Sequence, residues 1–564
     1  MLNIFKKTAS LIKEKKFDQL QNLSIEKPEY FNWVEEIFEG IHLVERPDKA
    51  ALLWTDEVET VSYSFLQLSE KYNQLLNFLR SKGVKQHDIV LTQLLLQPIN
   101  WVANLTCIKG GLQLIPTATI MGVPDLVYRF EKTMPKVVIS DQDNAHKIDE
   151  AEQESNKKIA VKIICEGKRE GWYTLEDIES QETTAQGAKT KSDDTLFMFF
   201  TSGTTGMPKV VCHTHFSYPV GYLTTASWIG LLEDDIHYNI SQPGWAKFAW
   251  SSIFAPWCIG ATIFAHHSSN RFNAKTTLKL IEQFKITTLC APPTVLRLFI
   301  QEDIKSHSFS LRECVAAGEP LNPEIIEAWK EATGVLIRDG FGQTESTCLV
   351  ANLPDTHVKF GSMGKPTFLY DIVIADNEGA ILSDNEEGNI CINMKAGKAN
   401  GIFKSYLNDS ERQAKVFKNN LYYTGDKAYR DSDGYIWFIG RDDDVIKSSD
   451  YRIGPFEIES ILLEHEAVIE SAAVGSPHPI KGYEVKVFIV LHENHSASNE
   501  IAEILFQHCR KNISPYKTPR IIEFVEELPK TVSGKIRRVE LRAGEAENKA
   551  KKKTSNQEFF YKRK

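Results

Sequence analysis

Short apolar stretches alternate with helix-like patterns along most of this chain, from about residue 41 to residue 440. In the stretch 276–285, apolar residues recur at helical spacing, and the apolar segments ITTLCAPP and VAAGEPL follow soon after it. Strands that alternate with helices in this way build parallel sheets covered by helices. The pattern therefore predicts an α/β fold, with a large N-terminal domain that spans residues 1–440.

The composition excludes several classes of protein. Of the 564 residues, 42% are hydrophobic and 10% aromatic, so the chain can bury a sizeable core. Lys and Arg total 66 against 75 Asp and Glu, and the net charge of -9 argues against nucleic acid as the main partner. Nine scattered cysteines without a Cys-x-x-Cys pair favour a reducing compartment. The N-terminal 20 residues predict an amphipathic helix and no targeting peptide, so we expect a cytoplasmic protein.

One uncharged stretch, 248–270, approaches the length of about 20 apolar residues that a membrane-spanning helix needs. Pro256, Gly260 and several serines interrupt it. A buried helix that ends near Trp257, followed by a strand over 261–266, explains the stretch without a membrane. We therefore predict no membrane span.

The pattern changes after Arg441, where the run DDDVIKSSDYRIG is polar and charged. A helix from Pro455, strands near 468–474 and 484–491, and a helix near 499–510 predict a compact α+β unit. We expect a hinge at 441–444, a small C-terminal domain at 445–545 and a basic, disordered tail at 546–564.

One helix of the large domain has clear start and stop signals. Asn322 is a capping residue, Pro323 suits the first turn, and Gly334 can adopt the left-handed conformation that ends a helix. These signals predict a helix over 323–333.

The segment 196–211 joins an apolar strand to a polar loop. Glycines let main-chain N–H groups approach an anion closely, hydroxyl groups add donors, and Lys209 adds charge. The segment therefore predicts a polyphosphate cradle, although such a stretch on its own is more often a flexible connection. It is not a Walker loop, because Val210 follows the lysine. The loop residues are Thr201, Ser202, Gly203, Thr204, Thr205, Gly206 and Lys209.

The order TSGTTGMPK resembles the phosphate loop of the adenylate-forming superfamily, which contains acyl-CoA synthetases, luciferases and the adenylation domains of peptide synthetases. Four further signatures follow in order, so the resemblance covers about 196–538. They are AGEPL at 317–321, DGFGQTE at 339–345, the region 424–460, and PKTVSGKIRR at 529–538. The resemblance implies ATP and Mg²⁺ as cofactors, a small barrel-like subdomain in the large domain, and a mobile C-terminal domain.

The resemblance also implies roles for single residues. Thr344 would hold phosphate and Glu345 the metal, Asp426 and Arg441 would bind the ribose hydroxyls, and Asp443 would be the pivot. Carboxylate oxygens suit both tasks, because they accept hydrogen bonds from a diol and coordinate Mg²⁺. The alternatives are that Asp426 is a turn cap and Glu345 a surface carboxylate. The implied nucleotide site further includes Gly318, Glu319, Pro320, Asp339, Gly340, Phe341, Gly342 and Gln343, and the implied catalytic set is Lys535, Thr344, Glu345 and Arg452.

The implied reaction has two steps. A carboxylate attacks the α-phosphorus of ATP, while Lys535, Mg²⁺ and the 201–209 loop stabilise the developing charge. The small domain then rotates about Asp443, and the 447–454 loop brings a thiol, expected to be coenzyme A, to the acyl-AMP. Without the resemblance, Lys535 would be interpreted as another solvated lysine.

The motifs most resemble those of the acetyl/medium-chain branch of acyl-CoA synthetases. At the position of Gly342, acetyl-specific relatives carry a tryptophan that shortens the acyl pocket, so glycine implies room for more carbons. We therefore expect a carboxylic acid of short to medium chain, branched or aryl. Trp245 matches a pocket-wall tryptophan of this branch, and a plain core aromatic residue is an almost equal alternative.

One position departs from this branch. In the thiol tunnel, Ser449 is followed by Asp450, where the relatives carry glycine, which allows close backbone approach. A buried, unpaired carboxylate costs several kcal/mol, so Asp450 must stay hydrated or pair with a cation such as Lys447 or Arg452. The alternative function is therefore an acyl- or aryl-adenylating enzyme that delivers to an acyl-carrier protein or another acceptor. A catalytically silent nucleotide-binding protein ranks third, because no adenylation residue is missing.

Overall fold

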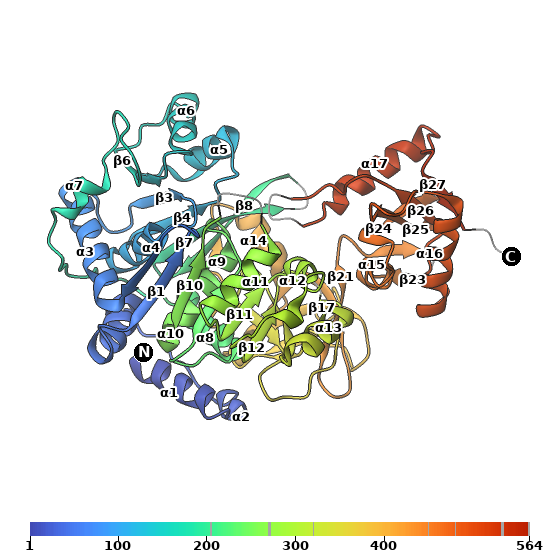
Figure 1. Cartoon of the computed structure of the whole chain (residues 1–564), viewed down its shortest axis with the longest axis horizontal. Coiled ribbons are helices and arrows are strands. Elements are labelled where there is room, and N and C mark those ends of the chain that lie inside the picture. Colours follow the sequence, from blue (N-terminus) through green and yellow to red (C-terminus); the bar gives the residue numbers. More distant parts are fainter. Residues whose placement is uncertain are drawn as a thin grey trace.

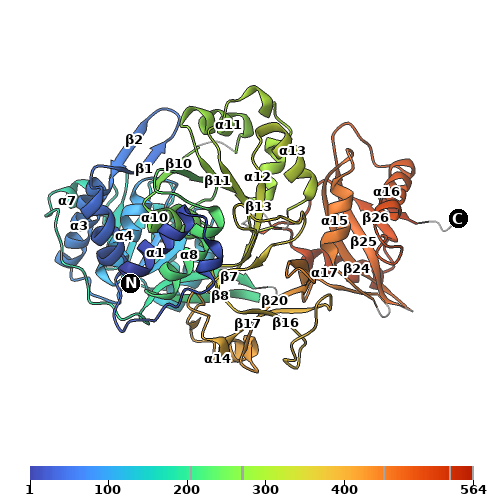
Figure 2. The ribbon, with the colours of Figure 1, turned by 90° about the horizontal axis from the view of Figure 1, so that it is seen from below.

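The computed structural model describes residues 1–203, 206–268, 272–319, 321–448, 451–479, 481–531 and 535–561. Within these residues, the large domain contains two mixed sheets and a smaller antiparallel sheet, and a fourth sheet forms the small C-terminal domain. Figures 1 and 2 show the small domain at one end of the molecule, beside the large domain.

The first large sheet has the strand order β15-β14-β13-β12-β11-β9-β10-β1-β2, and its central strands are parallel. Parallel strands that helices cover on both faces must be apolar on both, and β10 and β11 are buried at every residue. The strands are β1 (Ala50–Thr55), β2 (Thr60–Ser64), β9 (Ile236–Asn239), β10 (Thr262–His266), β11 (Thr288–Ala291), β12 (Glu313–Ala316), β13 (Ile337–Gly342), β14 (Cys348–Ala351) and β15 (Lys365–Pro366).

The second large sheet has the order β18-β8-β7-β4-β3-β5-β6, and antiparallel strands complete its β18 edge. Its strands are β3 (Ile89–Gln93), β4 (Gln113–Thr117), β5 (Val137–Ser140), β6 (Val161–Ile164), β7 (Thr195–Gly203), β8 (Gly206–Thr214) and β18 (Ser405–Tyr406). The antiparallel subdomain contains β16 (Ile372–Ala375), β17 (Gly388–Asn393), β19 (Phe417–Lys418), β20 (Leu421–Arg430) and β21 (Ile436–Arg441).

Helices fill the space between and around the sheets. Helix α8 (Ser217–Ile229) is buried along its whole length and contacts β8, β12 and β14, so it links the two large sheets. The other helices of the large domain are α1 (Leu2–Lys13), α2 (Phe17–Leu20), α3 (Phe65–Ser81), α4 (Ile99–Gly110), α5 (Val123–Thr133), α6 (Ala145–Ser155), α7 (Leu175–Glu179), α9 (Ala246–Ala249), α10 (Ala255–Ile259), α11 (Ala274–Gln283), α12 (Pro293–Phe299), α13 (Pro323–Thr333) and α14 (Ser410–Val416). Two π-helices, η1 (Val34–Leu43) and η2 (Trp250–Phe254), and two 3-10 turns, η3 (Ile304–Ser306) and η4 (Met394–Ala396), complete the domain.

The small domain packs helices on its own sheet and has its own apolar core. It contains β22 (Ile446–Ser448), β23 (Tyr451–Ile453), β24 (Val468–His478), β25 (Gly482–Leu491), β26 (Ile521–Phe524) and β27 (Glu558–Phe560), with α15 (Pro455–Leu463), α16 (Asn499–Asn512) and α17 (Arg538–Ala550). In Figure 1 the chain that enters α17 extends out of the small domain toward β8.

The prediction of a disordered tail at 546–564 is wrong for the part of this segment that the structure describes. Residues 538–550 form α17, and β27 adds a strand beside β26. The reason is a tertiary contact that composition does not reveal. The buried Lys486 ammonium lies 2.5 Å from Glu545 Oε2 and 2.8 Å from Glu558 Oε1, so it holds the end of the chain against the sheet.

Other local expectations are confirmed. Helix α13 begins after Asn322 and ends before Gly334, which has a φ of 76°. The expected capping by Asn322 is wrong, however, because its side chain makes no capping hydrogen bond and its Oδ1 instead accepts a 3.0 Å hydrogen bond from Ser460 Oγ. The uncharged stretch forms η2, α10 and the strand β10, and α1 is an amphipathic N-terminal helix. In the part of the chain that the structure describes, no helix is long and apolar enough to cross a membrane.

Candidate functional site

The predicted polyphosphate loop lies where β7 ends and β8 begins. These strands pair antiparallel, with Phe200 opposite Val210 and Thr201 opposite Lys209. Helix α5 supports the loop, because the Tyr128 hydroxyl donates a 3.0 Å hydrogen bond to the Pro208 carbonyl. Thr201 Oγ1 is buried and has no hydrogen-bond partner among the described residues, which fits a group that a ligand would satisfy. Thr204, Thr205 and the side chain of Ser202 lie outside the described residues.

Lys209 joins the phosphate loop to Glu345. Its ammonium pairs with Glu345 Oε1, and the Tyr406 hydroxyl donates a 2.9 Å hydrogen bond to the same oxygen. Glu345 is only 5% exposed. Burial opposes ionisation of this carboxyl, but Lys209 and Tyr406 outweigh it and hold the pKa below its usual value. The adjacent Thr344 carbonyl accepts a 2.7 Å hydrogen bond from His213 Nε2, which fixes the backbone of the motif.

Asp426 and Arg441, the predicted ribose pair, face each other across β20 and β21. Arg441 Nε lies 4.0 Å from Asp426 Oδ1, and Gln343 Nε2 donates a 2.5 Å hydrogen bond to Asp426 Oδ2. Because Asp426 is buried, its pKa rises to about 6, although Arg441 and Lys535 oppose the shift. The carboxylate can therefore exchange a proton near neutral pH.

Lys535 lies within electrostatic range of Asp426, Arg441 and Glu319. The residue is solvent-exposed, but the surrounding protein removes part of the hydration of its ammonium. This loss of hydration, and then the Arg441 guanidinium, lower the pKa of the ammonium, while Glu319 and Asp426 oppose the change. The structure thus brings the C-terminal lysine to the ribose pair of the large domain.

Glu319 follows the carboxyl end of β12, where the chain turns at Gly318 with a φ of 103°. That left-handed conformation favours glycine. Glu319 Oε2 accepts a 2.6 Å hydrogen bond from Thr294, and Lys247 Nζ donates a 3.0 Å hydrogen bond to the Ala317 carbonyl. Pro320 lies outside the described residues.

Asp339 is buried at the start of the 339–345 motif. Its Oδ1 accepts a 2.8 Å hydrogen bond from the Gly340 amide, and burial raises its pKa well above the usual value. Trp228 packs closely against Gly340. The neighbouring Phe341 is partly buried, and its ring centroid lies 6.5 Å from that of Phe438. The motif is thus packed into the large domain.

The space beside Gly342 is occupied rather than open. A Cβ atom at this position would lie 2.1 Å from the Thr347 carbonyl oxygen and 2.5 Å from Trp250 Cη2. Trp250, in η2, therefore fills the region that we expected glycine to leave free. Trp245 lines a small cavity nearby with Phe248.

The hinge and thiol-tunnel residues are only partly described. Asp443 lies in the turn after β21, where we expected the pivot. Ser449 and Asp450 lie outside the described residues, as does the side chain of Arg452.

Sequence reasoning did not identify Lys247, Tyr406 or Trp250 as site residues. Lys247 and Trp250 come from the segment that holds Trp245, so the cation in SQPGWAKFAW was the available signal. Tyr406 had no local signal, because the pairing of β18 with β8 brings it to Glu345.

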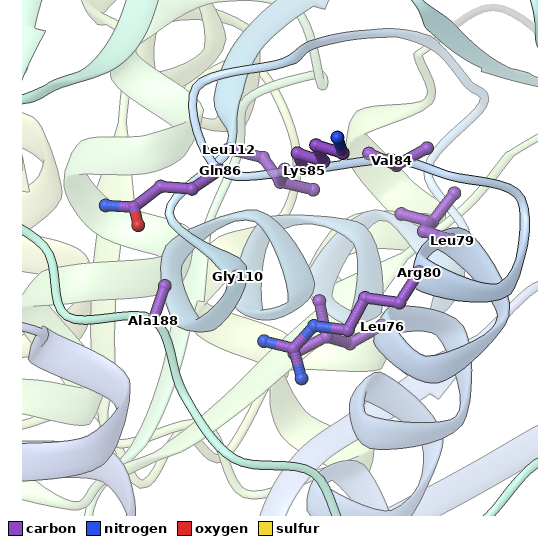
Figure 3. A pocket seen from close by; sticks show the side chains of 9 residues that line it. All are labelled: Leu76, Leu79, Arg80, Val84, Lys85, Gln86, Gly110, Leu112 and Ala188. Carbon is purple, nitrogen blue, oxygen red and sulfur yellow. The ribbon is translucent and has the colours of Figure 1, made fainter.

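A cavity of about 210 Å³ lies elsewhere, between α3 and the C-terminal end of α4 (Figure 3). Leu76, Leu79 and Leu112 line it, and Figure 3 shows Arg80 on one side and Lys85 on the other. Basic residues are favoured near a helix C-terminus, which explains Arg80 at the end of α3 without a ligand. None of the predicted site residues lines this cavity.

The fold places this chain in a known class. The large α/β domain, the phosphate loop between β7 and β8, and the small α+β domain reproduce the architecture of the adenylate-forming ligases. The solved anthranilate CoA ligase AuaEII, in complex with anthranoyl-AMP, superimposes with a TM-score of 0.85 at 31% identity, covering 94% of this chain and 99% of that one. A benzoate CoA ligase from Burkholderia xenovorans gives a TM-score of 0.79 at 26% identity, covering 91% of this chain and 100% of that one.

Sequence comparison identifies the family. The AMP-binding enzyme model matches residues 42–407, and the AMP-binding enzyme C-terminal domain model matches 457–535. The 4-hydroxybutyrate–CoA ligase 1 of Metallosphaera sedula is 46% identical over 535 residues, covering 94% of this chain and 93% of that protein. The mitochondrial acyl-coenzyme A synthetase ACSM3 of Mus musculus is 39% identical over 536 residues, covering 93% and 92%. The chain belongs to the AMP-binding enzyme family and, within it, to the acyl-CoA synthetase branch.

Proposed function

We propose that this protein activates a carboxylic acid with ATP to an acyl-AMP and then transfers the acyl group to coenzyme A. The proposal rests on one observation: Lys535 lies within electrostatic range of Asp426, Arg441 and Glu319. These residues come from two domains, yet their charges act on one another at a single place. Such an arrangement suits a reaction whose first step needs positive charge at a phosphate.

In the first step, a carboxylate oxygen of the acid bonds to the α-phosphorus, and the bond to pyrophosphate breaks. Negative charge grows on the phosphoryl oxygens, so preorganised cations lower the barrier. Lys535 would supply one such cation, and Lys209 anchors the phosphate loop to Glu345. Asp426 and Arg441 would orient the ribose, which keeps the reacting atoms in line.

We propose Mg²⁺ as the cofactor, held by Glu345 and phosphate oxygens. Lys209 and Tyr406 both engage Glu345 Oε1, and no side chain within the described residues pairs with Oε2. This carboxylate oxygen fits a hard cation that takes its remaining ligands from phosphate and water. The bound ion would neutralise phosphate charge.

We propose an acid of short to medium chain, with hydroxylated and aryl acids included. Supporting names are the 4-hydroxybutyrate ligase among the relatives and the anthranilate and benzoate ligases among the similar structures. Trp250 beside Gly342 limits the depth of the pocket, which argues for compact acids over long straight chains.

We propose coenzyme A as the acceptor. Coenzyme A is supported by the names of the relatives, and an acyl-carrier protein is the alternative because of Asp450. We also propose a cytoplasmic location, which is supported by nine free cysteines, all of them buried.

The test of the function is a panel of C2 to C10, hydroxylated, branched and aromatic acids, assayed for acid-dependent pyrophosphate exchange and for AMP formation with coenzyme A. Lys535→Ala should lower exchange by about 10²–10³, the usual cost of one preorganised donor. Hydrolysis or thiolysis of supplied acyl-AMP should stay largely intact. Unchanged exchange in this variant would remove Lys535 from the mechanism. Absence of exchange with every acid in the wild-type protein would overturn the function.

A further inference from the structure

The hinge turn is tied to the helix that follows the Lys535 loop. Asp444 lies in the turn after β21, and its side chain is largely buried. Asp444 Oδ1 pairs with Arg542 Nη1, and Asp444 Oδ2 lies 3.8 Å from Arg538 Nη1. Both arginines belong to α17, in its first and second turns. One carboxylate of the hinge therefore contacts two cations at the start of this helix.

A second carboxylate holds the same helix end. Glu459 of α15 binds Arg538 through two parallel hydrogen bonds, 3.0 Å from Nε to Oε1 and 2.6 Å from Nη2 to Oε2. Glu459 is buried, and its Oε1 also accepts a 2.7 Å hydrogen bond from the Ala473 amide of β24. Bidentate pairs of this kind fix both distance and orientation. Burial opposes the charge of Arg538, but Glu459 and Asp444 outweigh it and raise the pKa.

The loop that presents Lys535 ends at this clamped helix. Thr531 N donates a 2.7 Å hydrogen bond to the Lys535 carbonyl, and Lys530 pairs with Ile536 as an isolated antiparallel bridge. Arg537 N donates to the Pro529 carbonyl at 2.8 Å. Only two residues separate Lys535 from Arg538. These contacts close the base of the loop directly before α17, so the position of Lys535 depends on the position of this helix.

We propose that Asp444, with Arg538 and Arg542, is a positioning device that couples the hinge turn to the Lys535 loop and holds Lys535 at the nucleotide for the adenylation step. The inference rests on the proposed function, because it assigns the device to the step in which Lys535 acts.

This coupling has a definite kinetic consequence. The large domain holds the proposed nucleotide and acyl sites, so loosening the device should leave the KM values for ATP and acid nearly unchanged. The rate of adenylation should fall, because a misplacement of about 1 Å can cost about 10² in rate. Thiolysis of supplied acyl-AMP should be spared, because the proposed mechanism withdraws Lys535 for that step.

The test compares Asp444→Asn and Arg542→Gln with the wild-type protein in the two half-reactions separately. Asp444→Asn keeps the shape of the side chain and removes its charge, and Arg542→Lys keeps a charge as the conservative variant. Arg537→Gln is the matched control, because Arg537 pairs with the exposed Glu540 at 2.9 Å on the same helix end. Thermal unfolding of each variant measures loss of stability independently.

We expect Asp444→Asn and Arg542→Gln to lower kcat for acid-dependent pyrophosphate exchange by about 10- to 100-fold, with thiolysis changed less than about threefold. Arg542→Lys should recover most of the exchange, and Arg537→Gln should match the wild type. Equal losses in both half-reactions, or a loss that follows thermal stability alone, would overturn the positioning role. If the wild type is active and the Asp444→Asn variant is unaffected, the positioning role is also overturned, but the proposed function stands. A wild type without exchange overturns the function itself, and the inference with it.

Discussion

Replacement of Trp250 by leucine should let the protein accept acids with longer acyl chains. The Trp250 ring lies where a side chain on Gly342 would begin, since its Cη2 atom is 2.5 Å from the position that a Cβ atom on Gly342 would take. Leucine is smaller by six heavy atoms, so space for several methylene groups opens beside Gly342. Each methylene that finds apolar contact changes selectivity by about 1–3 kcal/mol, or 10- to 200-fold. Two added carbons should therefore raise the relative kcat/KM of a longer acid by at least about 100-fold.

The reverse substitution, Gly342→Trp, would ordinarily be expected to favour acetate. Here the Thr347 carbonyl oxygen lies 2.1 Å from the Cβ position, and a backbone atom cannot move aside as a flexible side chain can. Overpacking of this kind costs typically about 1–3 kcal/mol or more. We therefore expect Gly342→Trp to lose stability as well as to change selectivity.

The assay is acid-dependent pyrophosphate exchange across straight-chain acids from C2 to C10, with relative kcat/KM as the measured quantity. Truncation of a buried tryptophan also costs stability, so Trp329→Leu serves as the control. Trp329 is fully buried in α13, in a different apolar cluster. If folded Trp250→Leu protein keeps the wild-type ranking of chain lengths, Trp250 does not limit the acyl pocket. A similar shift in Trp329→Leu would show that lost stability, and not pocket depth, causes the change.

Two further predictions concern charge. Burial raises the pKa of Asp426 to about 6 in the folded protein, so protonation of this carboxyl stabilises the folded apoprotein. This stabilisation is fully present below pH 3.8, the ordinary pKa of the group, and is lost as the pH rises through 6. ATP affinity should show the opposite trend and weaken as the pH falls through 6. In calorimetric titrations with ATP, the Asp426→Asn variant should bind more weakly than the wild type, and its affinity should not change as the pH passes through 6. Asp450→Gly should raise thiolysis of supplied acyl-AMP by coenzyme A and hardly change pyrophosphate exchange. Slower thiolysis in Asp450→Gly would instead favour a carrier protein or another acceptor.

The local sequence was sufficient to predict the helices and strands that have their own start, stop or periodicity signals. The start and stop residues of α13 and the strand before Thr201 could be predicted because capping and strand patterns depend on near neighbours. The family motif assigned Asp426 and Arg441 to one site, but their placement opposite each other on antiparallel strands could be known only from the structure.

Contacts between distant segments escaped prediction. The lysine-rich end of the chain has the composition of a disordered tail, yet it is ordered because Lys486, some 60 residues earlier, pairs with Glu545. Likewise, the crowding of Gly342 depends on Trp250, which lies about 90 residues upstream. Composition and periodicity carry no information on such pairs.

The burial of all nine cysteines bears on the chemistry of the acceptor. Coenzyme A is a thiol, and thiols exchange with accessible disulfides and react with oxidised sulfur on proteins. Burial raises the pKa of Cys212 to about 11 and keeps its sulfur from solvent, so little thiolate is available for mixed disulfides. Because its cysteines are buried, the protein does not readily form mixed disulfides with the coenzyme A that it uses as a cosubstrate. Its activity should persist through oxidative episodes that would glutathionylate an exposed cysteine.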